Sequence, residues 1–234
     1  MIFALRHPAV LLGLVLGFLI GIPLRAAAQR AIAGGTSRRP RAQLHQVGSQ
    51  RSGPSWRPAG GWSTYFDPYG AVAAALSGVG WGSRQPVRRN SRFGDVLMLV
   101  AALVVHGALA VAGFAALNAA GVDYRVFAHI DATTILHGGG TFGKFDQDVA
   151  AGFAMVNLGC GLLALWPIPP LELGVVLWTR LPRTPGAQRM AYHVLEEQWG
   201  VAIALLFLLL PLVGQQPLLL TLINDVSTAI FGQF

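Results

Sequence analysis

The sequence predicts an all-α polytopic membrane protein, a helical bundle with about four to six membrane segments. Of its 234 residues, 53% are hydrophobic and only 12% are charged, and the mean hydropathy is +0.53. That composition is too apolar and too poor in charge for an ordinary soluble domain. Long apolar runs also alternate with short Arg-rich stretches, as the positive-inside rule predicts for membrane proteins. We therefore expect one integral membrane domain over residues 1–234, surrounded by a lipid bilayer.

Four apolar runs have the length or composition of membrane spans: residues 9–28, 93–120, 149–178 and 199–214. Residues 26–28 resemble a signal-peptide cleavage site, but Arg25 interrupts the run where such a site should be small and neutral. We therefore interpret the first run as an uncleaved helix. Two further segments are ambiguous: residues 69–82 are short enough to be re-entrant or tilted, and residues 217–234 fit either a span or an interfacial helix.

The distribution of charge predicts which loops face the cytoplasm. Residues 29–66 and 84–94 are rich in Arg, and so is the segment 180–198, whereas four of the ten acids, Asp123, Asp131, Asp146 and Asp148, lie in 122–147 or just beyond it. The positive-inside rule places the Arg-rich segments in the cytoplasm, with the N-terminus and the acidic loop external. A nucleic-acid site in 29–66, where aromatics are interleaved with Arg, is the less favoured interpretation. We expect the bacterial plasma membrane as the location and no nucleic-acid partner.

The run 149–178 is interrupted by three prolines in four residues, Pro167, Pro169 and Pro170. Each lacks a backbone N–H and disfavours helix in the residue before it, so the helix must break here. Glu172 follows at once, and a carboxylate inside an apolar run marks a candidate functional site. The alternative is a kinked helix whose Glu172 sits at the membrane interface without a role.

The sequence around the break resembles a known family. Residues 167–174 are similar to the Asn-x-x-Pro-x-Pro-x-Leu-Asp-Gly motif of the site-2 proteases, which are intramembrane zinc metalloproteases. Residues 67–70 resemble the family's Asp-Pro-x-Gly turn, and residues 78–87 resemble its Gly-x-Gly-Trp-x-x-Pro-Val segment. The likeness covers a core over 9–180 and leaves C-terminal helices in 190–234. The proline motif is carried by Pro167, Pro169, Pro170, Leu171 and Gly174.

The catalytic positions of that family are replaced in this chain. The resemblance implies HExxH on the first core helix, where two His bind zinc and the Glu is the general base. In register, those three positions are Leu24, Arg25 and Ala28. The family's third ligand, an Asp, is Glu172 here, and the Asn of its third segment is His106.

We therefore expect a catalytically inactive site-2-protease-like protein, with no cofactor, that acts by binding another membrane protein or complex. If the family packing persists, Arg25 and Glu172 face each other and form a buried ion pair. The alternative is an active zinc metalloprotease with relocated ligands, and a transporter-like role for the broken helix is a third possibility. The relocated ligands would come from His106, His129, His137 and Glu172.

Overall fold

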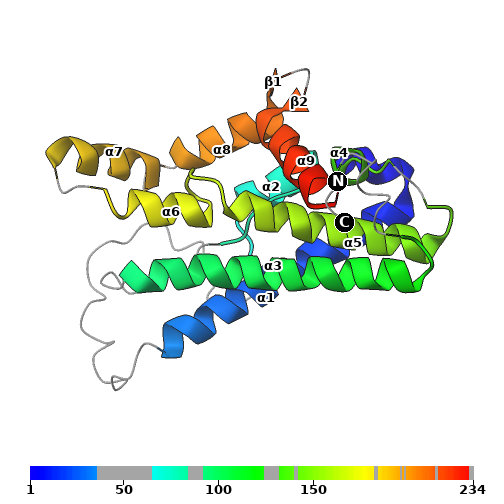
Figure 1. The fold of residues 1–234 in the computed structure, drawn as a ribbon. Helices are drawn as coiled ribbons and strands as arrows, with labels where there is room; N and C mark the ends of the chain where they lie inside the picture. The colour runs from blue at the N-terminus through cyan, green and yellow to red at the C-terminus, as the bar shows by residue number, and fades with distance from the viewer. Residues whose placement is uncertain are drawn as a thin grey trace.

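The chain folds into an all-α structure, shown in Figure 1 as a computed structural model. The described residues are 1–35, 65–83, 92–123, 132–139, 142–181, 184–195, 197, 199–213 and 216–231. Within these ranges there are nine α-helices, a short 3-10 helix at Ile2–Arg6, and two short strands. The predicted helical class is thus confirmed.

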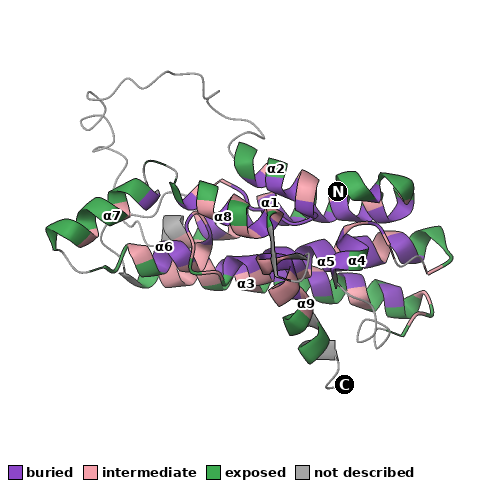
Figure 2. Cartoon of the chain, turned by 90° about the horizontal axis from the view of Figure 1, so that it is seen from above, coloured by how far each residue is buried: buried purple, intermediate pink, exposed green. Residues whose placement is uncertain are grey.

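Three long helices form the centre of the bundle: α1 (Pro8–Gly35), α3 (Arg92–Ala119) and α5 (Phe145–Ala164). Each contacts the other two, and successive members run in opposite directions along the bundle (Figure 1). Helix α5 is the most deeply buried of the three, as the purple ribbon in Figure 2 indicates. The apolar runs that the sequence marks as spans at 9–28 and 93–120 therefore correspond to α1 and α3.

Close packing of α1 on α5 depends on glycines spaced four residues apart. Gly13, Gly17 and Gly21 share one face of α1, because residues four apart lie above one another on a helix. A side chain at Gly13 would run into the carbonyl of Val149, and one at Gly17 into the side chain of Val156. Small residues of this kind let membrane helices approach closely, where packing rather than water exclusion drives association.

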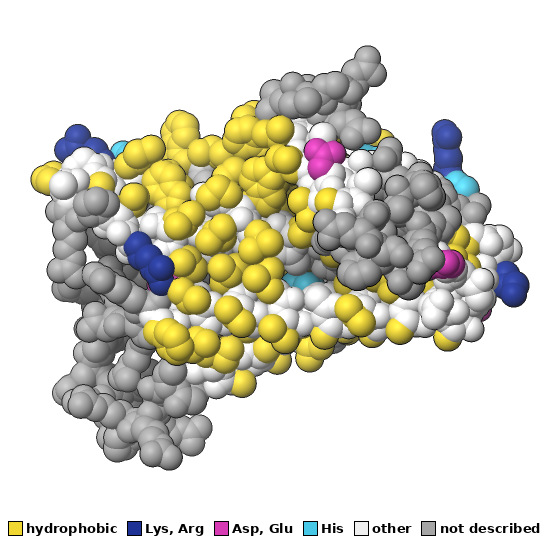
Figure 3. All heavy atoms as spheres, in the orientation of Figure 1, with side chains coloured by type: hydrophobic (Ala, Val, Ile, Leu, Met, Phe, Trp, Pro, Cys, Tyr) yellow, Lys and Arg dark blue, Asp and Glu magenta, His cyan; other side chains and the backbone are white. Residues whose placement is uncertain are grey.

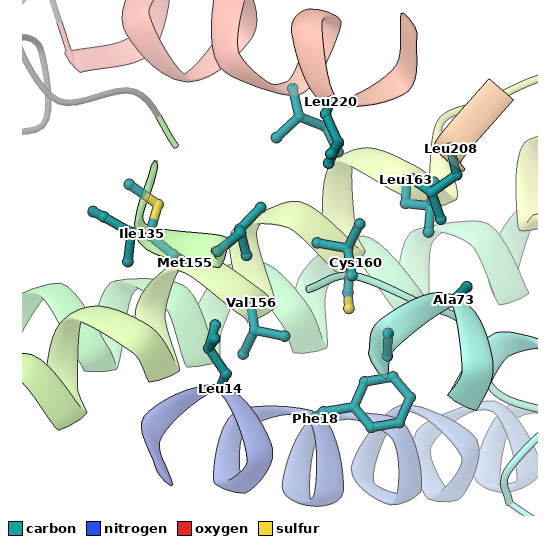
Figure 4. Close-up of a cluster of buried hydrophobic side chains, with 14 of the residues drawn as sticks. Leu14, Phe18, Ala73, Ile135, Met155, Val156, Cys160, Leu163, Leu208 and Leu220 are labelled. Atoms are coloured by element: carbon teal, nitrogen blue, oxygen red, sulfur yellow. The ribbon is translucent and has the colours of Figure 1, made fainter. Parts of the chain in front are cut away.

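The hydrophobic core extends from this contact. Phe18 of α1, Met155 and Leu163 of α5, and Leu208 and Leu220 from the C-terminal helices belong to one buried cluster (Figure 4). This hydrophobic cluster therefore packs the segment 9–180 and the C-terminal helices into a single unit.

Local residues explain where the short helix α2 (Pro68–Ser77) begins and ends. Asp67 caps it by accepting hydrogen bonds from the backbone N–H of Tyr69 at 2.9 Å and of Gly70 at 3.0 Å, and Pro68 occupies the first turn. The helix ends at Gly78, which has the left-handed conformation that favours glycine (φ 87°). Ten residues are too few to cross a bilayer, as the sequence indicated for this segment.

The polar loop expected over 122–147 is partly helical. It contains α4 (Ala132–Leu136), and α5 begins at Phe145 rather than near Val149. Acidic side chains are favourable in the first turn of a helix, and Asp146 and Asp148 lie there. Asp148 also accepts a hydrogen bond of 2.7 Å from the backbone N–H of Phe142. Polarity assigned Asp146 to the loop, but Asp146 and its neighbour Phe145 form the start of α5.

Beyond the break lie α6 (Glu172–Trp178), α7 (Pro185–Leu195), α8 (Trp199–Leu209) and α9 (Leu218–Phe231). The expectation that residues 199–214 form a span by themselves is wrong. Helix α8 has 11 residues, about half the length that a bilayer needs. After it, β1 (Pro211–Val213) pairs antiparallel with β2 (Gln216–Pro217). Pro211 lacks an N–H, which explains why the helix stops.

The described helices indicate an integral membrane protein. Three of them, within α1, α3 and α5, are long and apolar enough to cross a membrane, and α7 with α8, bent by 60°, would make a fourth. Hydrophobic side chains cover the middle of the face in Figure 3, whereas its Lys and Arg side chains lie toward the ends. The count is thus three or four candidate spans, at or below the lower end of the range expected from the sequence.

Candidate functional site at the proline break

The proline motif forms the connection between α5 and α6. Helix α5 ends at Ala164, and α6 restarts at Glu172. Within the connection, the backbone N–H of Gly174 donates to the carbonyl of Trp166 at 3.0 Å, which folds α6 back against the start of the break. Gly174 must lack a side chain, because a Cβ there would run into the backbone of Ile168. The break thereby fixes the place of Glu172.

Arg25 and Glu172 form an ion pair. Arg25 Nη1 donates to Glu172 Oε1, and the two side chains are 4% and 12% exposed. These residues are 147 positions apart in the chain. The structure thus confirms the pairing predicted from the sequence.

The other two positions of the replaced motif do not join this pair. Leu24 is 47% exposed and Ala28 is half-buried, whereas Arg25 is buried. Successive helix residues point in different directions, so Leu24 faces outward when Arg25 faces inward. The inward residue one turn beyond Arg25 is Gln29, whose Nε2 donates to the carbonyl of Met98 at 3.1 Å. Gln29 lies four residues after Arg25, and this spacing could have identified it from the sequence as a second inward-facing residue.

A second buried polar contact lies next to the first. His106 Nδ1 of α3 is 3.0 Å from Asn157 Oδ1 of α5. Asn157 also donates through Nδ2 to the carbonyl of Phe153 at 2.9 Å and more weakly to that of Gly17 at 3.4 Å. Sequence reasoning missed Asn157, because a single amide in an apolar run does not reveal its partner.

Cys160 completes the buried surroundings of the ion pair. Its side chain is buried in the core cluster. The thiol lies against the backbone of Gly80 and within electrostatic range of both Arg25 and Glu172. The extended segment after α2 therefore packs beside the site.

The alternative zinc ligands are not brought together among the described residues. His106 contacts Asn157, Glu172 is paired with Arg25, and His137 packs near the ring of Phe3 with 5.1 Å between centroids. Burial lowers the pKa of His137, which lies outside the candidate spans. His129 lies outside the described residues. Within the described ranges, no group of three or more His, Cys, Asp or Glu could hold a metal ion.

No protein-family model, curated protein or solved structure matches the chain. The geometry itself must therefore indicate what the site can do. A guanidinium cannot act as a base, since it stays protonated in proteins. The carboxylate of Glu172 faces this cation rather than a second acid or a His. The described site is a neutralised pair of buried charges that links the first helix to the proline break.

Proposed function

We propose that this chain is a catalytically inactive site-2-protease-like membrane protein, a pseudoprotease that acts by binding as a regulator, scaffold or accessory subunit of a membrane complex. The observation that supports this most is the Arg25–Glu172 ion pair. The pair joins α1 to the proline break. By the resemblance, site-2 proteases would carry the HExxH motif on the first of these and the third zinc ligand at the second.

The chemistry of the pair favours binding over hydrolysis. A catalytic zinc site needs three protein ligands and one open position for water. Arg25 occupies the position of the general base, and its positive charge would repel a metal cation from Glu172. Breaking the pair to free Glu172 would strand a buried guanidinium, which is strongly unfavourable.

The outer face of α3 supports a role in binding other helices. Its exposed residues are mostly small, and adding a Cβ at Gly107 would meet nothing within 4 Å. Small residues four apart allow a second membrane helix to approach closely. The residues of this face are Gly107, Ala108, Val111, Ala112, Ala115 and Ala116.

Metal analysis of the purified full chain tests the absence of catalysis. We expect no stoichiometric zinc in the wild type after equilibration with zinc and desalting. The matched variant is Glu172→Ala, which removes the one carboxylate of the motif. Zinc bound at one ion per chain and lost in Glu172→Ala would overturn the proposal and favour the metalloprotease with relocated ligands.

Photo-crosslinking in intact membranes tests the binding role. A photoreactive residue at Ala112 should give a discrete covalent product with another polypeptide, and Gly107→Leu should reduce that product. Gly107 is exposed and a Cβ there would meet nothing within 4 Å, so the fold should tolerate Gly107→Leu. Adducts with lipid alone at Ala112 would contradict a binding role for this face.

A further inference from the structure

The hydrogen bonds of Asn157 determine which nitrogen of His106 carries the proton. Nδ2 of Asn157 donates to the carbonyl of Phe153, so its Oδ1 is the atom that faces His106. An amide oxygen can only accept, and His106 Nδ1 must therefore be protonated. A neutral imidazole protonated at Nδ1 leaves a lone pair on Nε2. That atom is buried, in a residue only 1% exposed, and has no partner among the described residues.

Within the described part of the chain, two buried donors in the same part of the bundle also have no hydrogen-bond partner. Arg25 uses Nη1 for Glu172, but its Nε–H is unpaired. Trp81 Nε1–H is likewise buried and unpaired. Gly82, next to Trp81, packs against Arg25, because a Cβ at Gly82 would lie 3.0 Å from Arg25 Nη2.

The same face of α1 contacts the ring of His106 and carries Arg25. The ring of His106 lies against Gly21, where an added Cβ would come within 3.0 Å of Cε1. Arg25 is one turn further along the same face of α1. A Cβ at Gly21 would also come within 2.5 Å of Asn157 Oδ1, so only glycine lets His106 and Asn157 pack this closely against α1.

These groups define the chemistry of a ligand. The unpaired nitrogens offer N–H donors and one lone pair, so the ligand must both accept and donate hydrogen bonds. It must also be neutral, because Glu172 already balances the charge of Arg25. A buried polar group left unpaired is destabilising, and a bound ligand that pairs with it would remove that penalty. Water is the smallest molecule with these properties, and buried waters typically make two to four such bonds.

We propose that the interior around His106 Nε2 and Arg25 Nε is a hydration site, in which water donates to His106 Nε2 and accepts from Arg25 Nε–H. The inference does not depend on the proposed function, since it follows from the unpaired atoms alone. Such water would solvate the Arg25–Glu172 pair at membrane depth and lower the desolvation penalty of keeping two charges there.

Solid-state NMR of the full chain in lipid bilayers, labelled at His and Met, tests the proposal. The ¹⁵N shifts of His106 should show Nδ1 protonated and Nε2 unprotonated. Water-edited magnetisation transfer should then reach the His106 ring about as fast as it reaches His193, which is exposed. The dry control is the methyl group of Met155, which is 1% exposed within the apolar core.

Two outcomes would overturn the hydration site. Transfer to His106 as slow as transfer to Met155 would show that the space is dry. Protonation at Nε2 would show that the lone pair is not available. The signal of His106 is assigned by its loss in His106→Gln, or by substituting the other five His in turn if that variant fails to insert.

Discussion

At the scale of single residues, buried polar groups dominate the behaviour of this chain. Arg25, His106 and Asn157 all lie within the three long helices, and each is at most 4% exposed. In a membrane, such groups are retained only where they find partners, since lipid offers none. Asn157 is the connecting residue, because it bonds both α3 through His106 and its own helix through Phe153.

Asn157→Ala should destabilise the protein by about 1–3 kcal/mol, because it strands the N–H of His106 and removes two further bonds. The measurement is thermal unfolding in detergent. Asn118→Ala is the control, since Asn118 is exposed near the end of α3 and its loss should change little. Equal effects of the two variants would show that the His106–Asn157 contact contributes nothing.

At the scale of elements, the contact between α1 and α5 determines how close the site residues come. The glycines of α1 allow this approach, and Gly152 does the same from α5, where a Cβ would reach the carbonyl of Val10 at 2.5 Å. Helix α1 then carries Arg25 to the level of the proline break. The site therefore depends on backbone packing as much as on its own side chains.

Gly17→Ala should destabilise the bundle by about 1–3 kcal/mol, because the added methyl overlaps Val156 and approaches Asn157 Nδ2 at 2.9 Å. Gly107→Ala is the matched control on α3, where the added methyl meets nothing. Replacing this helical glycine should leave stability unchanged or raise it by up to about 1 kcal/mol. A Gly17→Ala variant as stable as Gly107→Ala would contradict the packing described for α1 and α5.

Particular residues show which of these features the sequence could predict. Arg25 and Glu172 were predictable as partners, because each is a charge in an apolar run and such a charge needs a partner. The rotation of α1 was not, since one sequence does not fix which face packs inward, and Leu24 proved to be exposed. The length of α8 was overestimated from its apolar character, although Pro211 could have indicated its end.

At the scale of the whole molecule, the arrangement of helices agrees with the predicted sidedness. The starts of α1 and α5 lie at one end of the bundle together with α4 (Figure 1). The start of α3 lies at the other end with α6 and α7. Segments predicted to be external thus adjoin one end, and those predicted to be cytoplasmic adjoin the other. The location of each end stays a prediction.

Cysteine labelling in sealed membrane vesicles checks this topology. Single cysteines at Ser49 and Thr141 should react from opposite sides of the membrane, with Ser49 cytoplasmic and Thr141 external. Cys160 is buried and should stay unlabelled, which makes it the internal control. Labelling of both positions from the same side would rule out the predicted arrangement.

The central claim is that Arg25 and Glu172 form a buried ion pair in which each charge depends on the other, and a double-mutant cycle tests it most directly. Arg25→Ala and Glu172→Ala should each destabilise the protein in detergent by about 3–5 kcal/mol, because each leaves the other charge buried alone. The double variant should cost clearly less than the sum of the two. Leu24→Ala, on the exposed face of the same turn, should have little effect. Additive or negligible losses would mean that the two charges do not depend on each other, and the account would fail.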